Sequence, residues 1–498
     1  EIGNMVPQTP PEDADMAEAM EIFQPARTRS LDEALAPTSK KAKTVAMLVA
    51  AISEAQAIEA KQKNSGEEEE ENLRRYCREK IERDADSIKK TRKAEIDSWE
   101  LRKVFVRWNR EEAKKTGAKI LSGRWVDDDY KEKSRYVARE FNDCQDPTNF
   151  AVASDTSTSK VVDLHAVKRK LPTFCFDVVS AFTSAPEEEL IFLEPPPEDI
   201  AEHGDCVWQP VMKVYGRRNA SKSWQDHFVE IVQKKECPYK VERCPKQPNI
   251  FYCAEADMTI DLHVDDGHGS GKPKEVTKFI EFLMKHIDLK YSGLIYPGMQ
   301  YEFLRATKVR TNEGLVTIPN GRYIAESLML LGMEHCNPST SPKLEKSIME
   351  GDEVLVAEDK ASIYRTVVGK LIHLVKERSD AQSSVRALCK KLRNPDQLAW
   401  RMLVKVMRYL KGTMTMGTMF TTEGVVDQIE AYSDSDWASD VVDRKSVSGS
   451  AIMVGDCKMH THARGQPVPA LSSCESELIS AGDTGKEALM LQHVLDFI

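Results

Sequence analysis

The sequence lacks any long hydrophobic run. Hydrophobic residues make up 41% of its 498 residues, yet no stretch reaches the roughly 18 apolar residues that a membrane-spanning helix needs. The first ten residues also lack the basic-then-apolar order of a secretory signal. We therefore expect no membrane partner and an intracellular location.

Cysteine pairs at metal-binding or redox spacing are also missing. The 11 cysteines are odd in number and form no C-x-x-C pair, which predicts reduced thiols. Cys457, His460 and His462 offer zinc ligands, but no second pair at zinc-finger spacing follows. A hairpin within a sheet is the favoured interpretation there.

The chain lacks an overall positive charge. It has 70 Lys+Arg against 80 Asp+Glu, a net charge of −10, which argues against a wholly basic nucleic-acid coat protein. The charge is uneven, however. Residues 101–140 carry 12 − 7 = +5 and residues 376–411 carry 10 − 3 = +7. Two basic segments in an acidic chain favour a polyanionic partner.

Composition divides the chain into regions. Residues 1–43 are rich in Pro, Ala and acids and are predicted to be disordered. Residues 43–115 favour a charged, solvated helix, with a coiled coil as a further option. Beyond residue 108, short apolar runs alternate with helical stretches, as in an α/β protein.

Two adjacent acids form the sharpest local motif. An alternating strand over residues 260–264 leads into Asp265 and Asp266 and then into a glycine-rich turn over residues 267–271. Neighbouring carboxylates repel one another unless a cation lies between them, and magnesium prefers such ligands. Taken alone, the motif fits an ordinary turn better. His263 and His268 flank it and could bind a transition metal, although local substitution is the favoured interpretation.

A second acid makes a metal site a better interpretation than an ordinary turn. Asp177 lies within the apolar strand pattern of residues 174–182, where an unpaired acid is costly. Asp177, Asp265 and Asp266 together would form a two-metal site, which activates a hydroxyl and stabilises a leaving pyrophosphate.

Ordered blocks of sequence then resemble the reverse transcriptase of copia-type LTR retrotransposons. Residues 133–139 (KSRYVAR) resemble K-A-R-L-V-A-R, and residues 177–182 (DVVSAF) resemble D-V-K-T-A-F. Residues 214–224 (VYGRRNASKSW) resemble L-Y-G-L-K-Q-A-P-R-A-W, and residues 264–266 match the end of Y-V-D-D. The order of the blocks makes the resemblance specific.

The resemblance continues to the C-terminus. Residues 364–371 resemble Y-R-x-L-V-G-S-L and residues 408–413 match R-Y-L-K-G-T. Residues 432–438, 444–449 and 471–477 resemble the start of the family's ribonuclease H domain. Together the blocks cover roughly residues 125–498.

The resemblance implies a mixed α/β (α+β) fold, namely a right-hand polymerase with an antiparallel palm sheet and helices, followed by a partial ribonuclease H-like mixed sheet. We expect a disordered and charged helical tail over residues 1–97 and fingers and palm over 98–345. A helical thumb or connection would span 346–425, and the ribonuclease H-like part 426–498.

The resemblance also implies residue roles. Asp177, Asp265 and Asp266 would be catalytic and hold two magnesium or manganese ions, while Asp434 and Glu477 would be metal ligands in the ribonuclease H-like part. The remaining roles concern substrates. Lys133 and Arg135 would neutralise the triphosphate, Phe182 would crowd the sugar edge, Asn219 would touch the nucleotide, and Arg408 and Lys411 would lie along the template–primer backbone.

The implied function is that of an RNA-directed DNA polymerase, a nucleotidyltransferase of a retrotransposon polyprotein. Its partners would be an RNA template, a DNA primer and deoxynucleoside triphosphates, in a cytoplasmic particle or the nucleus. Because residue 498 precedes the remaining ribonuclease H aspartates, no RNA cleavage is expected from the chain as it stands.

Departures from the family blocks support an alternative. His263 replaces the usual Tyr, Asn219 replaces Gln, Glu140 replaces Gly, and residues 267–271 (GHGSG) replace an apolar strand. Loss of that strand would loosen the catalytic hairpin. The alternative is a decayed or domesticated nucleic-acid-binding relic. A coiled-coil interaction protein is a third possibility, which explains nothing beyond residue 125.

Overall fold

The structure, a computed structural model, describes residues 73, 74, 77, 81–141, 151, 156–343, 354–424, 428–440 and 443–498. All of them belong to one compact unit, Glu69–Ile498. The segment expected to be disordered, residues 1–43, lies outside the described residues, as does most of the tail up to residue 80. Within the described ranges, no helix combines the length and apolar character needed to cross a membrane.

The first long helix, α5 (Ala85–Leu101), begins at Asp84, whose carboxylate accepts a hydrogen bond from the Ser87 N–H. Its buried residues are Ile96 and Trp99, so it packs as part of the fold. The tail boundary expected at residue 97 falls inside this helix. The charged helix expected over residues 43–115 is interrupted, because residues 105–109 form a strand.

A four-stranded sheet and a hairpin follow α5. The sheet has the order β1-β7-β6-β2, with strands β1 (Phe105–Asn109), β7 (Cys206–Pro210), β6 (Phe192–Leu193) and β2 (Ile120–Leu121). Helices α6 (Arg110–Lys115) and α8 (Pro197–His203) flank it, and β3 (Gly123–Asp127) pairs with β4 (Ser134–Ala138). Trp99, Tyr136 and Trp208 share one hydrophobic core, which fixes α5 against β4.

The largest sheet has six antiparallel strands in the order β12-β5-β11-β10-β9-β8. These strands are β12 (Leu289–Ile295), β5 (Thr173–Val178), β11 (Asp266–Ser270), β10 (Met258–His263), β9 (Ile250–Cys253) and β8 (Glu242–Arg243). A short 3-10 helix, η2 (Ala181–Ser184), follows β5. The sheet brings Asp177 and Asp266 onto adjacent strands.

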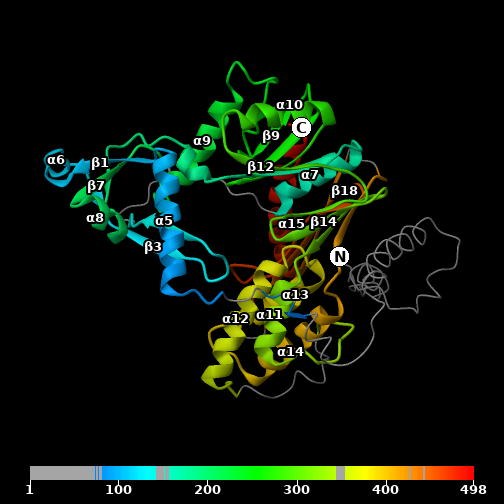
Figure 1. The fold of residues 1–498 in the computed structure, drawn as a ribbon. Coiled ribbons are helices and arrows are strands. Elements are labelled where there is room, and N and C mark those ends of the chain that lie inside the picture. Colours follow the sequence, from blue (N-terminus) through cyan, green and yellow to red (C-terminus); the bar gives the residue numbers. More distant parts are fainter. Residues whose placement is uncertain are drawn as a thin grey trace, which may run out of the picture. The chain divides into compact units, whose positions relative to one another are not determined.

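Helices cover both faces of this sheet. Phe174 and Phe176 belong to a core shared with α9 (Ala220–Val232) and α10 (Pro273–Met284). Both helices are labelled in Figure 1. On the other face, α7 (Thr156–Lys168) contacts β10 and β11. Asp177 and Asp266 alternate with the phenylalanines, so they share the α7 face.

The glycine-rich segment after Asp266 is a strand, contrary to the turn expected from its sequence. A Cβ at Gly267 would lie 2.1 Å from the Phe176 ring, and one at Gly269 would lie 2.3 Å from the Phe174 ring. Because the two rings occupy the space above the two glycines, the strand gains aromatic cover where it has no side chains of its own. The expected loosening of the hairpin is therefore wrong for this packing.

A second antiparallel sheet has the order β13-β14-β15-β16. Its strands are β13 (Gln300–Phe303), β14 (Ala306–Arg310), β15 (Gly314–Pro319) and β16 (Thr418–Thr421). Strand β16 lies in the segment 346–425 that was expected to be a helical thumb or connection. That segment thus ends in a strand of this sheet.

Four helices share a further core (Figure 1). They are α11 (Arg322–Leu331), α12 (Glu358–Leu374), α13 (Ser379–Cys389) and α14 (Gln397–Gly412). Helix α11 belongs to this cluster although the sequence placed it with the fingers and palm, because Ile324, Ala325 and Leu328 pack into the cluster core.

The C-terminal region is a three-stranded antiparallel sheet with a long helix. Strands β17 (Ile429–Asp436), β18 (Val447–Val454) and β19 (Cys457–Gly465) pair in that order, and α15 (Ser473–Leu495) contacts β17 and β18. The segment with Cys457, His460 and His462 is the third strand, as the favoured interpretation of its sequence expected.

Candidate active site

Four side chains form a row across adjacent strands of the six-stranded sheet. Lys290 of β12 pairs with Asp177 of β5, Asp177 pairs with Asp266 of β11, and Asp266 pairs with His263 of β10. Directly opposed residues of antiparallel strands project from the same face. Two of the three predicted catalytic aspartates are therefore immediate neighbours, although 89 positions separate them in sequence.

The third aspartate lies in the turn that joins β10 to β11. The Val178 N–H donates to the Asp265 carbonyl at 2.8 Å, which fastens this turn to the end of β5. Val264 has a positive φ of 57°, a strained conformation for a β-branched residue. The Trp224 indole N–H donates to the Val264 carbonyl at 2.5 Å, so α9 supports the strained turn.

The site concentrates negative charge. Burial raises the pKa of Asp266 to about 6, and repulsion from Asp265 and then Asp177 adds to the effect. Lys290 Nζ lies 3.7 Å from Asp177 Oδ2, with both side chains well exposed. One exposed lysine does not neutralise three carboxylates, so the site favours further cations.

Lys133 and Arg135 lie near the cationic end of this row. Lys133 directly precedes β4, which contains Arg135. Desolvation lowers the pKa of Lys133, and repulsion from Arg135 and Lys290 adds to it, whereas Glu95 acts in the opposite direction. Mutual repulsion among these cations favours a polyanionic ligand.

An aromatic contact joins the predicted sugar-edge residue to the cations. The Phe182 and Tyr215 rings meet edge to face, with centroids 6.0 Å apart, and the Arg135 guanidinium lies 5.8 Å from the Tyr215 centroid. Asn219 directly precedes α9, and its buried Oδ1 has no hydrogen-bond partner in the described part of the chain. Asn219 Oδ1 is thus a buried acceptor that the described residues do not use.

The two predicted template-binding cations are engaged within the helical cluster. Arg408 Nε donates to the Asn337 carbonyl at 2.6 Å. Lys411 Nζ donates to the carbonyls of Glu334 and Cys336 at 2.6 and 3.0 Å. Both side chains donate to backbone carbonyls of the segment that follows α11. This segment lies outside the strands that carry the aspartates.

Glu477 lies beside the strand that carries Asp434 in the C-terminal region. The Ser435 N–H, next to Asp434, donates to Glu477 Oε1 at 3.2 Å, and both acids are exposed. The Ser480 hydroxyl donates to the Asp434 carbonyl at 2.7 Å. Helix α15 thus brings one predicted ligand beside the strand that carries the other.

The two histidines around the acid pair lie on the same face of the sheet. His263 pairs with Asp266 in the row of charged residues, whereas His268 lies two residues beyond Asp266 on β11 and is fully buried, with its Nε2 2.9 Å from the Tyr301 hydroxyl. Within the described part of the chain, the group of side chains close enough together to hold a metal includes neither histidine.

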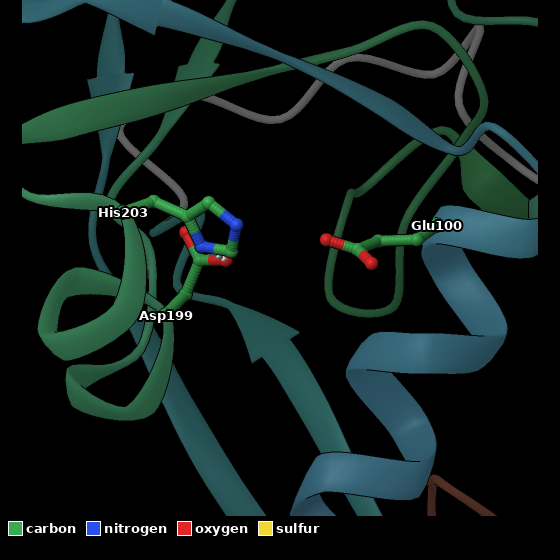
Figure 2. Close-up of side chains that lie close together, drawn as sticks. All are labelled: Glu100, Asp199 and His203. Carbon is green, nitrogen blue, oxygen red and sulfur yellow. Dashed lines mark ion pairs between the residues drawn. The ribbon is translucent and has the colours of Figure 1, made fainter.

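A different trio brings its ligand atoms within 4.8 Å of one another: Glu100, Asp199 and His203. Figure 2 shows Glu100 on α5 facing the other two on α8. Arg107 already binds both acids, with its Nε 3.3 Å from Asp199 Oδ2, and the Trp208 indole donates to the same oxygen at 2.8 Å. An arginine supplies the positive charge here, so the trio is a structural ion cluster.

Sequence reasoning missed several residues around the aspartates: Glu95, Lys290, Tyr215 and Trp224. The last two lie within a block that the sequence analysis quoted, so the block itself was a signal. The position of Lys290 beside Asp177 follows only from strand register, because the pairing of β12 with β5 cannot be predicted from one sequence.

Comparison with known proteins finds similarity to reverse transcriptases. The model for reverse transcriptase (RNA-dependent DNA polymerase) matches residues 112–345. The Retrovirus-related Pol polyprotein from transposon TNT 1-94 of Nicotiana tabacum is 27% identical over 403 residues, 76% of this chain and 29% of that protein. The corresponding polyprotein from transposon RE2 of Arabidopsis thaliana is 26% identical over 368 residues, 71% of this chain and 24% of that protein.

The chain therefore spans less than a third of the length of these curated relatives. Among solved structures, a foamy viral protease-reverse transcriptase in complex with RNA/DNA hybrid aligns with a TM-score of 0.48 and 10% identity. That alignment covers 84% of this chain and 48% of the other.

Proposed function

The chain carries a reverse transcriptase domain of the kind found in copia-type retrotransposon Pol polyproteins, and on this premise we propose that it acts as an RNA-directed DNA polymerase. The observation that carries the proposal is the register that pairs Asp177 with Asp266 beside the Asp265 turn. Its substrates would be an RNA template, a DNA primer and deoxynucleoside triphosphates.

The three aspartates fit divalent cations, which reverse transcriptases use. The raised pKa of Asp266 reflects burial beside two further carboxylates, an arrangement that a bound cation relieves. Carboxylates are the ligands that magnesium prefers, and we assign magnesium or manganese to Asp177, Asp265 and Asp266. When bound, two such ions supply activation of the primer 3′-hydroxyl and stabilisation of the leaving pyrophosphate.

The surrounding residues would orient the incoming nucleotide. Lys133 and Arg135 would neutralise the triphosphate, since fixed cations suit phosphate oxygens. Phe182, held against Tyr215, would limit space at the sugar edge and disfavour a 2′-hydroxyl. The free Oδ1 of Asn219 would accept a hydrogen bond from the nucleotide.

We further propose a right-hand arrangement. Residues 98–345 would supply fingers and palm, residues 346–425 a thumb or connection, and residues 426–498 a partial ribonuclease H-like region with Asp434 and Glu477 as metal ligands. Arg408 and Lys411 would contact the template–primer backbone only after releasing the backbone carbonyls to which they now donate hydrogen bonds.

The nucleic-acid-binding relic is less well supported. The glycine-rich segment that motivated it forms a paired strand covered by Phe174 and Phe176. The three aspartates are all present, and the turn between β10 and β11 is tied to both β5 and α9.

Primer extension tests the proposal. Wild-type protein should extend oligo-dT on poly-rA with magnesium, and Asp265→Asn should lower the rate by at least about 100-fold, as expected when a metal ligand is lost. Asp257→Asn, a substitution in the turn between β9 and β10, is the matched control and should keep near wild-type activity. Extension that Asp265→Asn leaves unchanged would refute the assigned site, and salt-sensitive template binding without extension would support the relic.

A further inference from the structure

A cluster of ion pairs fixes the turn that precedes α9. The Arg217 side chain is only 1% exposed and makes three ion pairs. Its Nη1 lies 2.7 Å from Glu140 Oε1, its Nε lies 3.0 Å from Glu187 Oε2, and its Nη2 lies 2.6 Å from Glu189 Oε2. All three nitrogens of the guanidinium are therefore used, a geometry that lysine cannot reproduce.

Glu140 also binds the backbone of the same turn. Its Oε2 accepts a hydrogen bond from the Arg218 N–H at 2.9 Å. Glu140 thereby contacts two consecutive residues, one through a side chain and one through the main chain. Its side chain is 16% exposed, so water weakens this interaction less than at an open surface.

The backbone of the turn lies directly on β4. The Ala138 N–H donates to the Tyr215 carbonyl at 2.7 Å. Gly216 has a positive φ of 89°, and a Cβ there would lie 2.0 Å from the Ala138 carbonyl oxygen. Only glycine permits this approach, so the turn and β4 are in direct backbone contact.

The sequence departures at the two ends of this contact belong together. In the blocks that the chain resembles, Gly follows the K-A-R-L-V-A-R motif where this chain has Glu140, and Leu follows Y-G where it has Arg217. These two replacements form an ion pair with each other. The replacement at Glu140, which counted against the polymerase assignment, is thus accompanied by a second replacement at its ion-pair partner Arg217.

We propose that Glu140 and Arg217 are a pair of positioning residues that set the nucleotide site. One side of the contact is β4, which contains Arg135 and directly follows Lys133, and the other is the turn that leads to Asn219. The pair fixes the separation between the triphosphate-binding cations and the acceptor on Asn219. This inference rests on the proposed function, since the site that it positions is the nucleotide site.

The affinity for the incoming nucleotide measures the effect of the Glu140–Arg217 pair separately from the catalytic step. On a template–primer with a dideoxy-terminated 3′ end, Glu140→Gln should weaken binding of the next correct deoxynucleotide by about 5- to 10-fold, as for loss of a partly buried charge-assisted contact. In extension assays the KM for the deoxynucleotide should rise equally, while kcat changes less than about twofold. Glu188→Gln, an exposed neighbour of the same acidic run, is the matched control and should bind normally.

A double substitution tests the pairing itself. Glu140→Gly and Arg217→Leu should each weaken nucleotide binding, and the double variant should bind more tightly than the product of the two single effects, because it removes both charges together. Hydrogen exchange of residues 214–220 in the protein without substrates should rise in Glu140→Gln and stay unchanged in Glu188→Gln.

The possible failures are distinct. Unchanged exchange in Glu140→Gln, unchanged nucleotide affinity, or strictly multiplicative single effects would each overturn the inference. If the wild type binds the nucleotide on the terminated primer but does not extend a normal primer, the proposed catalysis fails while the positioning claim is still decided by the affinities.

Discussion

The fold holds the Asp266 carboxylate at an energetic cost. Burial and two neighbouring carboxylates raise its pKa to about 6, above the ordinary value of 3.8. The folded protein therefore binds this proton more tightly than the unfolded chain does. The stabilisation from Asp266 is greatest below about pH 4 and declines as the pH rises to about 6 and above.

Asp266→Asn should raise the stability of the protein although it removes a proposed metal ligand. Without a cation at pH 7.5, the variant should be about 1–2 kcal/mol more stable than wild type, a figure already reduced for the partial exposure of the site. The difference should shrink below about pH 4.5, where Asp266 is protonated. Chemical denaturation at the two pH values measures this, and a variant that is less stable than wild type at pH 7.5 would contradict the repulsion described for the site.

At the residue scale, the order of the motifs along the chain identified the candidate site residues. It did not predict which side chains contact one another. The aspartates, Phe182 and Asn219 were readable because they stand in recognisable blocks. Lys290 was not, because its place beside Asp177 depends on strand pairing. The ion pair of Glu140 with Arg217 was hidden for a similar reason, since 77 positions separate the two residues.

At the scale of elements, β11 shows how tertiary packing overrides local preference. Its sequence, DGHGS, has the composition of a turn. Two neighbouring strands supply hydrogen bonds on both sides, and the rings of Phe174 and Phe176 fill the space that glycine leaves. Composition alone cannot predict such a strand, because the rings that cover it and the hydrogen bonds along one of its sides come from β5, which is distant in the sequence.

Gly267→Val should disrupt this strand although valine favours strands in general. The new side chain would meet the Phe176 ring, and overpacking of this kind costs about 1–3 kcal/mol. Gly482→Ala is the control, because nothing lies within 4 Å of its position for a Cβ. Thermal unfolding measures both, and a Gly267→Val protein as stable as wild type would refute the ring-over-glycine packing.

Behind β11, a buried ion pair links α7 to the second sheet. Lys308 of β14 binds Asp163 of α7, and both residues are buried. The Lys308 ammonium also lies 3.3 Å from the Ser159 hydroxyl. Asp163 Oδ1 is 3.7 Å from His268 Nε2, so the ion pair reaches the strand that begins with Asp266.

Lys308→Met should destabilise the protein by about 3–5 kcal/mol, because it leaves the Asp163 carboxylate buried and unpaired. The double variant Lys308→Met, Asp163→Asn should recover part of the loss, because it removes both charges. Denaturant unfolding of the three variants measures the coupling. Equal losses in Lys308→Met and the double variant would contradict a compensated pair.

For the molecule as a whole, the net charge of −10 conceals local basic segments. Residues 101–140 and 376–411 carry +5 and +7 by the count of their Lys, Arg, Asp and Glu residues. Part of this charge is used internally, as in the contacts of Arg408 and Lys411 with backbone carbonyls. Charge counts therefore do not predict the individual contacts that these cations make.

Binding of an RNA/DNA template–primer should depend strongly on salt despite the negative total. If six or more phosphates are contacted, affinity should fall by about 1,000-fold or more between 50 and 200 mM salt. Fluorescence anisotropy at several salt concentrations measures the slope. A slope near zero would mean that the basic segments do not face a nucleic-acid backbone.

The central claim is that β5 and the hairpin of β10 and β11 together form one polymerase site. Single-nucleotide incorporation on an RNA template tests it most directly, with wild type compared with Asp177→Asn, the substitution on the separate strand. We predict magnesium-dependent incorporation of the complementary deoxynucleotide by wild type and a loss of at least about 100-fold in the variant. Incorporation that survives Asp177→Asn, or its absence in wild type, would contradict the account.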